Sequence, residues 1–155
     1  MTNMTDKTND QTNQNTNNNH NEDCVFCKII VGDIPAFKVY EDDETLAILD
    51  IRPINYGHTL VIPKDHTENL YTLPPELACR MMLTAQKLAI SVKNGTDADG
   101  ITISMNSNVP GQLVDIHAHI HIIPRLNEDG LVEWPHKEYK EGDMQVYQDK
   151  IKAEL

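Results

Sequence analysis

Residues 117–125 read His-Ala-His-Ile-His-Ile-Ile-Pro-Arg, and no other stretch of the chain is as informative about its fold. Histidine recurs at every second position, at His117, His119 and His121, with small or aliphatic residues between. A period of two is the period of a β-strand, so the stretch predicts a strand with imidazoles on one face and aliphatic side chains on the other. Same-face side chains lie roughly 6.5–7 Å apart along a strand, so three imidazoles would line a groove about as long as a small phosphorylated ligand.

The rest of the folded region predicts an α+β fold, in which one long helix packs on a mostly antiparallel sheet. The helix begins at Pro74-Pro75-Glu76, because proline is favoured in a first turn, and ends at Asn94-Gly95. An acidic turn at residues 41–44 separates two short apolar runs and predicts a hairpin. Five strands are expected in all, at residues 38–40, 45–50, 58–63, 101–105 and 116–123.

Composition limits the classes of function. The chain has 155 residues, enough for one domain, and a formal net charge of −11. Such an acidic chain is not expected to bind nucleic acid, although a local pocket can still hold a small nucleotide. No apolar run approaches about 18 residues and no charged-then-apolar leader opens the chain, so neither a membrane span nor a signal peptide is expected. Three cysteines do not form a disulfide framework, and we expect a cytoplasmic protein.

The chain divides into three segments by composition. Residues 1–22 are almost all Asn, Thr, Gln and Asp, with no aliphatic residue beyond two methionines. Such a segment cannot bury enough apolar surface to offset the entropy lost on ordering, so it predicts a disordered tail. Residues 23–140 form the expected domain, and residues 141–155 form a C-terminal extension expected to be helical.

Two kinds of chemistry fit three aligned histidines, and the residues themselves leave both open. His-x-His on a strand can place two imidazoles on one metal ion, with a third ligand completing a catalytic site. Alternatively, one neutral imidazole attacks as a nucleophile while its neighbours orient it or bind oxyanions. The middle residue, His119, suits the nucleophile because it has an imidazole on each side. Histidines that merely form hydrogen bonds at a sheet surface would explain one such residue better than three.

The chain resembles the histidine triad (HIT) family from about Cys24 to Tyr139. The motifs that carry the resemblance are CVFCKII at 24–30, GDIP at 32–35, VYED at 39–42, LDIRP at 49–53, GHTLVIPKDH at 57–66 and HAHIHIIPR at 117–125. The resemblance implies a mostly antiparallel five-stranded sheet with one long helix and a short N-terminal helix. It also implies a homodimer that cleaves nucleotide conjugates at the α-phosphate.

The resemblance assigns roles to the triad by position. His119 matches the nucleophile that forms a nucleotidyl-histidine intermediate, later released by water. His121 matches a contact to the phosphate. His117 matches the residue that supports the nucleophile through its backbone carbonyl.

The resemblance also implies a substrate-binding set around the ribose and base. Asp50 matches the acid that binds the ribose hydroxyls, for which a carboxylate is chemically suited, and Leu49 and Ile51 match apolar walls around the base. Asn106, eleven positions before His117, matches an asparagine that contacts the ligand. A simple turn role remains open for both Asp50 and Asn106.

The pair Cys24 and Cys27 supplies two of the four ligands of a tetrahedral zinc site. In relatives that carry zinc, the other two ligands match His66 and His117, so the resemblance implies a closed, structural zinc. Such an ion would tie the N-terminal segment to the catalytic strand and fix the tautomer of His117. A redox pair and two free buried thiols are the alternatives.

Several residues near these motifs have a less definite role. Relatives usually carry Gln-x-Val-x-His before the triad, but residues 111–117 hold one residue more, which leaves the roles of Gln112 and Val114 open. Gln112 is retained as a substrate-binding candidate. His58 and His136 are interpreted as surface or strand residues, and Cys79 as a residue on the buried side of the long helix.

Two readings of function follow from these residues. The favoured one is a hydrolase or transferase that acts on nucleoside phosphoramidates or dinucleoside polyphosphates. The other is a non-catalytic nucleotide-binding module, or a metal protein in which the triad supplies ligands.

Overall fold

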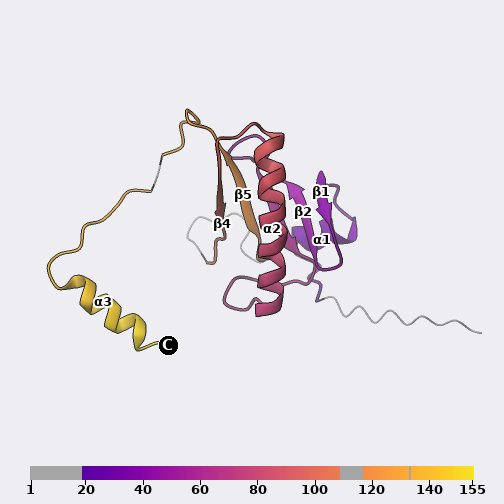
Figure 1. Ribbon diagram of the computed structural model, residues 1–155. Coiled ribbons are helices and arrows are strands. Elements are labelled where there is room, and N and C mark those ends of the chain that lie inside the picture. Colours follow the sequence, from indigo (N-terminus) through magenta and orange to yellow (C-terminus); the bar gives the residue numbers. More distant parts are fainter. Residues whose placement is uncertain (1–18, 109–116, 133) are drawn as a thin grey trace, which may run out of the picture.

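The computed structural model describes residues 19–108, 117–132 and 134–155 (Figure 1). The first half of the chain forms α1 (Val25–Val31), β1 (Lys38–Glu41), β2 (Thr45–Leu49) and β3 (Thr59–Pro63). The second half forms α2 (Pro75–Gly95), β4 (Gly100–Ser104), β5 (Ile120–Arg125) and α3 (Asp143–Lys152). The five strands make one sheet in the order β1-β2-β3-β5-β4, and every neighbouring pair is antiparallel. The α+β fold expected from the sequence is confirmed.

The long helix α2 covers one face of the sheet (Figure 1). Its buried side chains recur every three or four residues, the spacing of one helix face. They meet alternate residues of the strands, including Ala47 of β2, Val61 of β3, and Ile120 and Ile122 of β5. Burial of each of the valine and isoleucine side chains contributes roughly 1.5–3 kcal/mol to folding, so this packing fixes which way each strand faces.

The short helix α1 covers the opposite face of the sheet. Phe26 and Cys27 of α1 pack against the strand residues that alternate with the first set, namely Leu46 and Ile48 of β2 and Leu60 and Ile62 of β3. The apolar runs of β2 and β3 are therefore buried on both faces, which explains why they lack a polar–apolar alternation. Residues in the same two-residue phase as Leu60 point toward α1.

The strand that carries the triad differs from its prediction. We expected a strand over residues 116–123, but β5 begins at Ile120 and continues to Arg125. The prediction of its start was wrong because the backbone before Ile120 bonds to the loop after β3: the N–H of Ala118 donates to the Thr67 carbonyl, which is not in a strand. The aliphatic alternation nevertheless persists before the strand, since Ala118 joins Ile120 and Ile122 in the core under α2.

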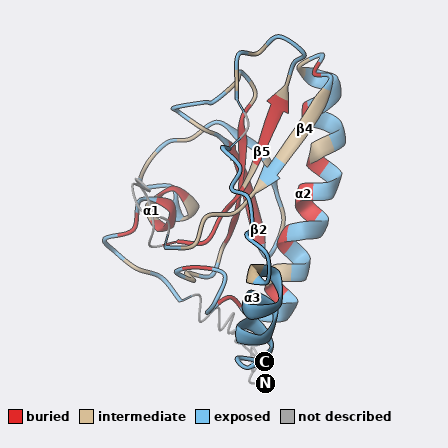
Figure 2. Cartoon of the chain, turned by 90° about the vertical axis from the view of Figure 1, so that its left-hand side faces the viewer, coloured by how far each residue is buried: buried red, intermediate tan, exposed pale blue. Residues whose placement is uncertain are grey.

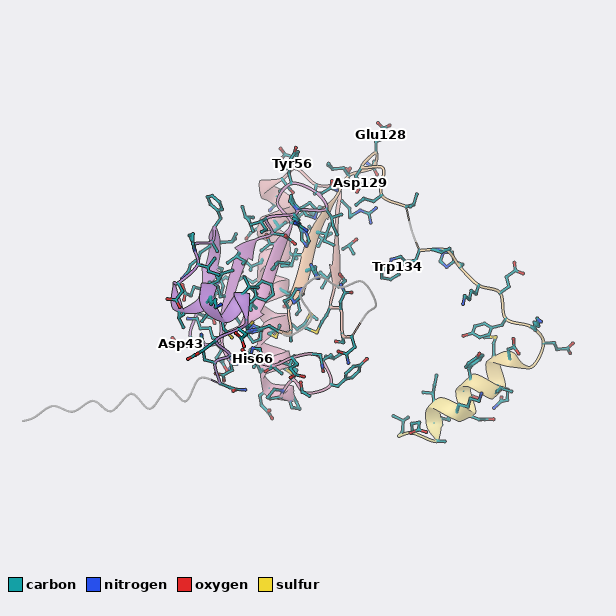
Figure 3. All side chains as sticks on the ribbon, turned by 180° about the vertical axis from the view of Figure 1, so that it is seen from behind. Asp43, Tyr56, His66, Glu128, Asp129 and Trp134 are labelled. Carbon is teal, nitrogen blue, oxygen red and sulfur yellow. The ribbon has the colours of Figure 1, made fainter. Side chains whose placement is uncertain are left out.

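Residues 19–22 and α3 lie outside this two-faced core. Of the tail predicted over residues 1–22, residues 1–18 lie outside the described residues, and residues 19–22 contact the domain. At the other end, the chain runs from Asp129 past Trp134 to α3, whose residues are all at least partly exposed (Figures 2 and 3). No helix in the described part of the chain is long and apolar enough to cross a membrane.

Candidate active site and metal centre

The triad histidines lie on the α1 side of the sheet because their neighbours lie on the α2 side. Ala118, Ile120 and Ile122 are buried under α2, so the alternation turns His119 and His121 the other way. Their ring centroids are 4.7 Å apart, closer than the roughly 6.5–7 Å of parallel side chains on a strand, so the two rings lean together. Phe26 of α1 packs edge-on against His119, with ring centroids 5.1 Å apart.

The geometry of His119 fixes its tautomer. Its Nδ1 lies 2.8 Å from the backbone carbonyl oxygen of His117. A carbonyl oxygen can only accept, so Nδ1 carries the proton and Nε2 keeps its lone pair. Burial lowers the pKa of His119, which keeps the ring neutral near pH 7. A buried neutral imidazole with a free Nε2 is suited to nucleophilic attack.

His121 is held in the complementary tautomer by a chain of hydrogen bonds. The backbone N–H of Ile54 donates to His58 Nδ1 over 3.3 Å, so the proton of this neutral ring lies on Nε2. His58 Nε2 then donates to His121 Nδ1 over 3.0 Å. The remaining proton of His121 lies on Nε2, a buried atom with no hydrogen-bond partner among the described residues. Burial lowers the pKa of His121 to about 4, so at neutral pH the ring offers one N–H donor.

Asp50 completes this group of side chains. Its Oδ1 accepts from the backbone N–H of Arg52 at 2.8 Å, and its Oδ2 lies 3.4 Å from His58 Nδ1. Asp50, His58 and His121 are close enough together to suggest an ion site. However, His58 Nε2 lies 3.0 Å from His121 Nδ1, which is a hydrogen-bond distance, and His58 Nδ1 accepts from the N–H of Ile54. We therefore interpret Ile54, His58 and His121 as a hydrogen-bonded chain, with the Asp50 carboxylate beside it.

The other predicted substrate-binding residues lie around this group. Leu49 ends β2, and Ile51 follows Asp50 with 90% of its side chain exposed. Asn106 lies two residues beyond Ser104, which pairs with His121 across the sheet, so it leaves β4 at the end beside the triad. The two candidates before the triad, Gln112 and Val114, lie outside the described residues.

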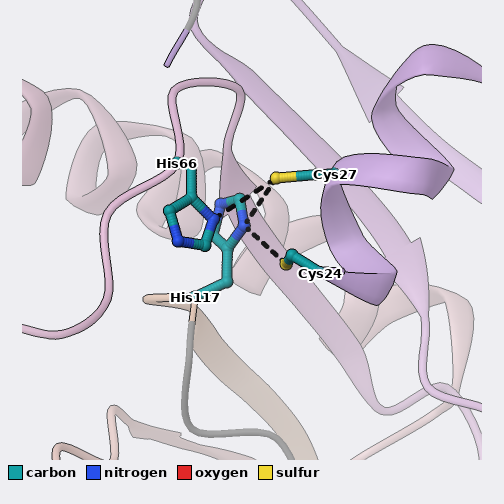
Figure 4. A group of neighbouring side chains, drawn as sticks. All are labelled: Cys24, Cys27, His66 and His117. Atoms are coloured by element: carbon teal, nitrogen blue, oxygen red, sulfur yellow. Dashed lines mark hydrogen bonds between the residues drawn. The ribbon is translucent and has the colours of Figure 1, made fainter. Parts of the chain in front are cut away.

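Four predicted metal ligands meet at the N-terminus of α1 (Figure 4). Cys24 Sγ lies 3.3 Å from His117 Nδ1, and Cys27 Sγ lies 3.3 Å from His66 Nδ1 and 3.7 Å from His117 Nδ1. One ligand atom from each residue falls within 4.8 Å of all the others. These residues come from α1, from the loop after β3 and from the segment before β5, so a bound ion would join three parts of the chain.

The donor set fits a tetrahedral zinc ion. Two thiols and two imidazoles form a Cys₂His₂ set, which is typical of closed structural sites. His117 Nε2 donates to the carbonyl oxygen of Pro63 at 2.9 Å, so the lone pair of Nδ1 faces the thiols. Burial raises the pKa of the Cys27 thiol, while the backbone N–H of Asn21 acts in the opposite direction. The groups present thus fit zinc better than a redox pair, because both cysteines face imidazoles.

Two readings from the sequence need correction. His58 is not a surface residue: it is 2% exposed, precedes β3 and contacts His121. Its role could have been found, because it shares the two-residue phase of Leu60, which faces α1. Cys79 is exposed, whereas we expected it on the buried side of α2. It lies two residues from both Leu77 and Met81, which is about 200° around a helix and opposite the buried face.

The comparison with known proteins agrees with this architecture. The HIT domain profile matches residues 31–128. The chain belongs to the HIT family. A crystal structure of a HIT family member from Bacillus subtilis superposes with a TM-score of 0.78 at 42% identity and covers 86% of this chain and 98% of that one. A zinc-bound histidine triad family protein from Mycobacterium smegmatis gives a TM-score of 0.66 at 39% identity, covering 85% and 97%.

Relatives of this HIT-family chain carry different functional names. Protein hit of Bacillus subtilis is 43% identical over 139 residues, which are 86% of this chain and 95% of the relative. Adenosine 5'-monophosphoramidase HNT1 of Candida albicans is 36% identical over 139 residues, 85% of this chain and 91% of the relative. Adenylylsulfatase HINT3 of Arabidopsis thaliana is 41% identical over 109 residues, 70% of this chain and 55% of the relative.

Proposed function

We propose that this protein hydrolyses nucleotide conjugates at the α-phosphate through an intermediate on His119. The observation that carries the proposal is the pair of opposite tautomers: a lone pair on His119 Nε2 beside an N–H donor on His121 Nε2. The names of the Candida and Arabidopsis relatives support a nucleotide substrate. Nucleoside phosphoramidates and dinucleoside polyphosphates are the substrate classes we expect.

The proposed reaction has two displacements at phosphorus. His119 Nε2 attacks the α-phosphorus, and the bond to the leaving group breaks as the nitrogen–phosphorus bond forms. The N–H of His121 donates to the phosphate, where negative charge grows in the transition state. Water then attacks the same phosphorus, which releases the mononucleotide and restores the neutral ring. Asp50 binds the ribose hydroxyls, with Leu49 and Ile51 beside the base.

We also propose that Cys24, Cys27, His66 and His117 hold one structural zinc ion. The ion would fix the ring of His117, and the carbonyl of the same residue orients His119. The zinc-bound Mycobacterium smegmatis structure supports this proposal. A zinc ion bound here would cross-link α1, the loop after β3 and the segment before β5. The proposed reaction at phosphorus is carried out by His119 and His121.

A third proposal is that two copies of the chain form a homodimer. Within the described part of the chain, β4 is an edge strand with no strand on its outer side. Next to this edge, α2 exposes Met82, Leu83 and Ile90, each with more than half of its side chain accessible. An open strand edge beside an exposed apolar helix face is suited to pairing with a second copy.

The alternative functions predict different chemistry at the triad. A metal site formed by the three histidines would need their nitrogens to converge on one ion. Instead, His117 faces two thiols, His119 donates to a carbonyl and His121 accepts from His58. This divergence favours a nucleophilic role of His119 over a metal-ligand role of the triad. A nucleotide-binding module would bind the conjugate without releasing AMP, whereas the proposed enzyme releases it.

The proposed reaction is tested by mass spectrometry of the denatured protein during turnover of an adenosine phosphoramidate. We expect AMP to accumulate and a fraction of the wild-type chain to gain one adenylyl group. His119→Ala should lose both signals, with activity reduced by at least about 10³-fold, because the nucleophile is absent. His20→Ala, an exposed histidine outside the site, is the control and should behave as wild type. Full activity in His119→Ala would contradict the proposed nucleophile.

A further inference from the structure

We propose that Asn19 and Asn21, which precede α1, form a strap that retains the metal ion. The inference rests on the zinc site proposed above. The backbone N–H of Asn21 donates to Cys27 Sγ over 3.4 Å. Asn19 exchanges two hydrogen bonds with the backbone of His66: its Nδ2 donates to the His66 carbonyl at 2.9 Å, and its carbonyl accepts from the His66 N–H at 2.7 Å. Each strap residue therefore contacts a different metal ligand.

The strap is held in place by its own turn. The carbonyl of Asn21 accepts from the N–H of Cys24 at 3.1 Å, and its side-chain Oδ1 accepts from the N–H of Asp23 at 2.9 Å. An asparagine that bonds the backbone two residues ahead forms an Asx turn, which fixes the chain just before a helix. The backbone hydrogen bond from Cys24, which does not depend on the side chain at position 21, sets where the N–H of Asn21 points.

The hydrogen bond to Cys27 should strengthen metal binding. A thiolate ligand carries negative charge, and an N–H donor aimed at it stabilises that charge. Partners of metal ligands in this outer position commonly change metal affinity by about 10–100-fold. Asn21 supplies this donor through its backbone, so side-chain substitution at position 21 preserves it and proline removes it.

The pairing of Asn19 with His66 acts on the most accessible ligand. Cys24, Cys27 and His117 are almost completely buried, whereas His66 is half-buried and borders an open groove that Asn19 also lines. Its loop is held on the inner side by a hydrogen bond from Ala118 N–H to the Thr67 carbonyl. The strap holds the outer side of the His66 loop. We therefore expect the ion to leave through this groove when the hydrogen bonds between Asn19 and His66 break.

The test measures zinc release from full-length protein. Each variant is loaded with one zinc ion per chain, and transfer to the chromophoric chelator 4-(2-pyridylazo)resorcinol is followed with time. Asn21→Pro should release zinc about ten-fold faster, and Asn19→Leu about three-fold faster, because each loses a hydrogen bond at a ligand. Asn21→Ala keeps the backbone donor and should stay within about two-fold of wild type, as should His20→Ala.

A spectroscopic measurement separates the thiolate contact from general loosening. In protein loaded with cobalt, the thiolate-to-metal charge-transfer band should move to longer wavelength in Asn21→Pro and stay in place in Asn21→Ala. A thiolate that loses a hydrogen bond is the better electron donor, which lowers the energy of this transition. If Asn21→Pro does not fold, the release rate of Asn19→Leu decides the question.

The outcomes distinguish the strap from the zinc site. If wild type binds one zinc ion and all variants release it at the wild-type rate, the strap is wrong and the zinc site stands. If wild-type protein prepared with ample zinc binds none, both the zinc site and the strap are wrong.

Discussion

At the scale of single residues, His117 connects the proposed metal centre to the proposed active site. Its side chain faces Cys24 and Cys27 and its backbone carbonyl accepts from His119, so one residue contributes different groups to two sites. With zinc bound as proposed, the fixed ring of His117 would hold this carbonyl in place, and the carbonyl keeps the proton of His119 on Nδ1. The third member, His121, depends in the same way on His58.

The dependence of His121 on His58 predicts the effect of substitution. His58→Phe fills a similar volume but cannot donate to His121 Nδ1, so the proton of His121 is free to move away from Nε2. We expect kcat for a phosphoramidate to fall by about ten-fold or more, the effect of one hydrogen bond at a reacting group, with a smaller change in KM. His58→Gln offers an amide donor in the same region and should recover part of kcat.

The measurement is a steady-state comparison of the three proteins at equal folded concentration. A His58→Phe variant with wild-type kcat would show that His121 needs no partner. Equal loss in His58→Phe and His58→Gln would point to packing instead of hydrogen bonding.

At the scale of elements, the candidate site is positioned by the alternation of side chains along three strands, in which every second residue faces the same side of the sheet. Ile48 and Leu60 face α1, so Asp50 and His58, each two residues away in the same phase, reach the same side as His121. The turn between β2 and β3 brings Asp50 and His58 together, since the N–H of Asp50 donates to the His58 carbonyl at 2.9 Å. The active-site group is therefore set by strand register and by this turn.

Gly57 makes the turn possible, and its replacement should be costly. Its φ is +90°, a conformation that side chains disfavour, and an added Cβ would run into Cγ2 of Thr96 after α2. We expect Gly57→Ala to lower the free energy of unfolding by about 1–3 kcal/mol, measured by urea denaturation. Gly95→Ala is the matched control: it lies in α2 with open space around it, and should change stability by at most about 1 kcal/mol in either direction. Equal stability of both variants would contradict the strain argument.

The sequence predicted most elements, and its errors have physical causes. Hydrophobic period and turn residues identified every strand of the sheet and α2, because these depend on local pattern. The start of β5 was wrong because the segment before it bonds to residues far away in sequence: the N–H of Ala118 donates to the Thr67 carbonyl, and the His117 side chain contacts Pro63. The role of His58 was missed because its partner His121 is 63 residues away in sequence, although the two-residue phase that His58 shares with Leu60 indicates the side of the sheet it faces. The resemblance to a family pointed to His66, which no periodicity indicates.

At the scale of the whole molecule, the apolar surface is unevenly distributed. One face of α2 packs on the sheet, while its outer side carries Met82, Leu83 and Ile90 in contact with solvent. The neighbouring edge strand β4 adds Ile103, whose side chain is 41% exposed. A chain with a formal net charge of −11 repels its own copies, so a stable pair needs an apolar contact such as this one.

The homodimer is tested by light scattering after size-exclusion chromatography. The wild type should elute with about twice the chain mass of 17.6 kDa. Ile90→Lys places a charge in the proposed contact, where burial without a partner is costly, and should give a monomer at micromolar concentration. Val31→Lys changes a residue at the end of α1, on the other face of the sheet, that is also more than half exposed, and this variant should remain dimeric. A monomeric wild type would exclude the homodimer. A dimer that survives both Ile90→Lys and Leu83→Lys would place the interface elsewhere, because either charge would lie within the α2 contact.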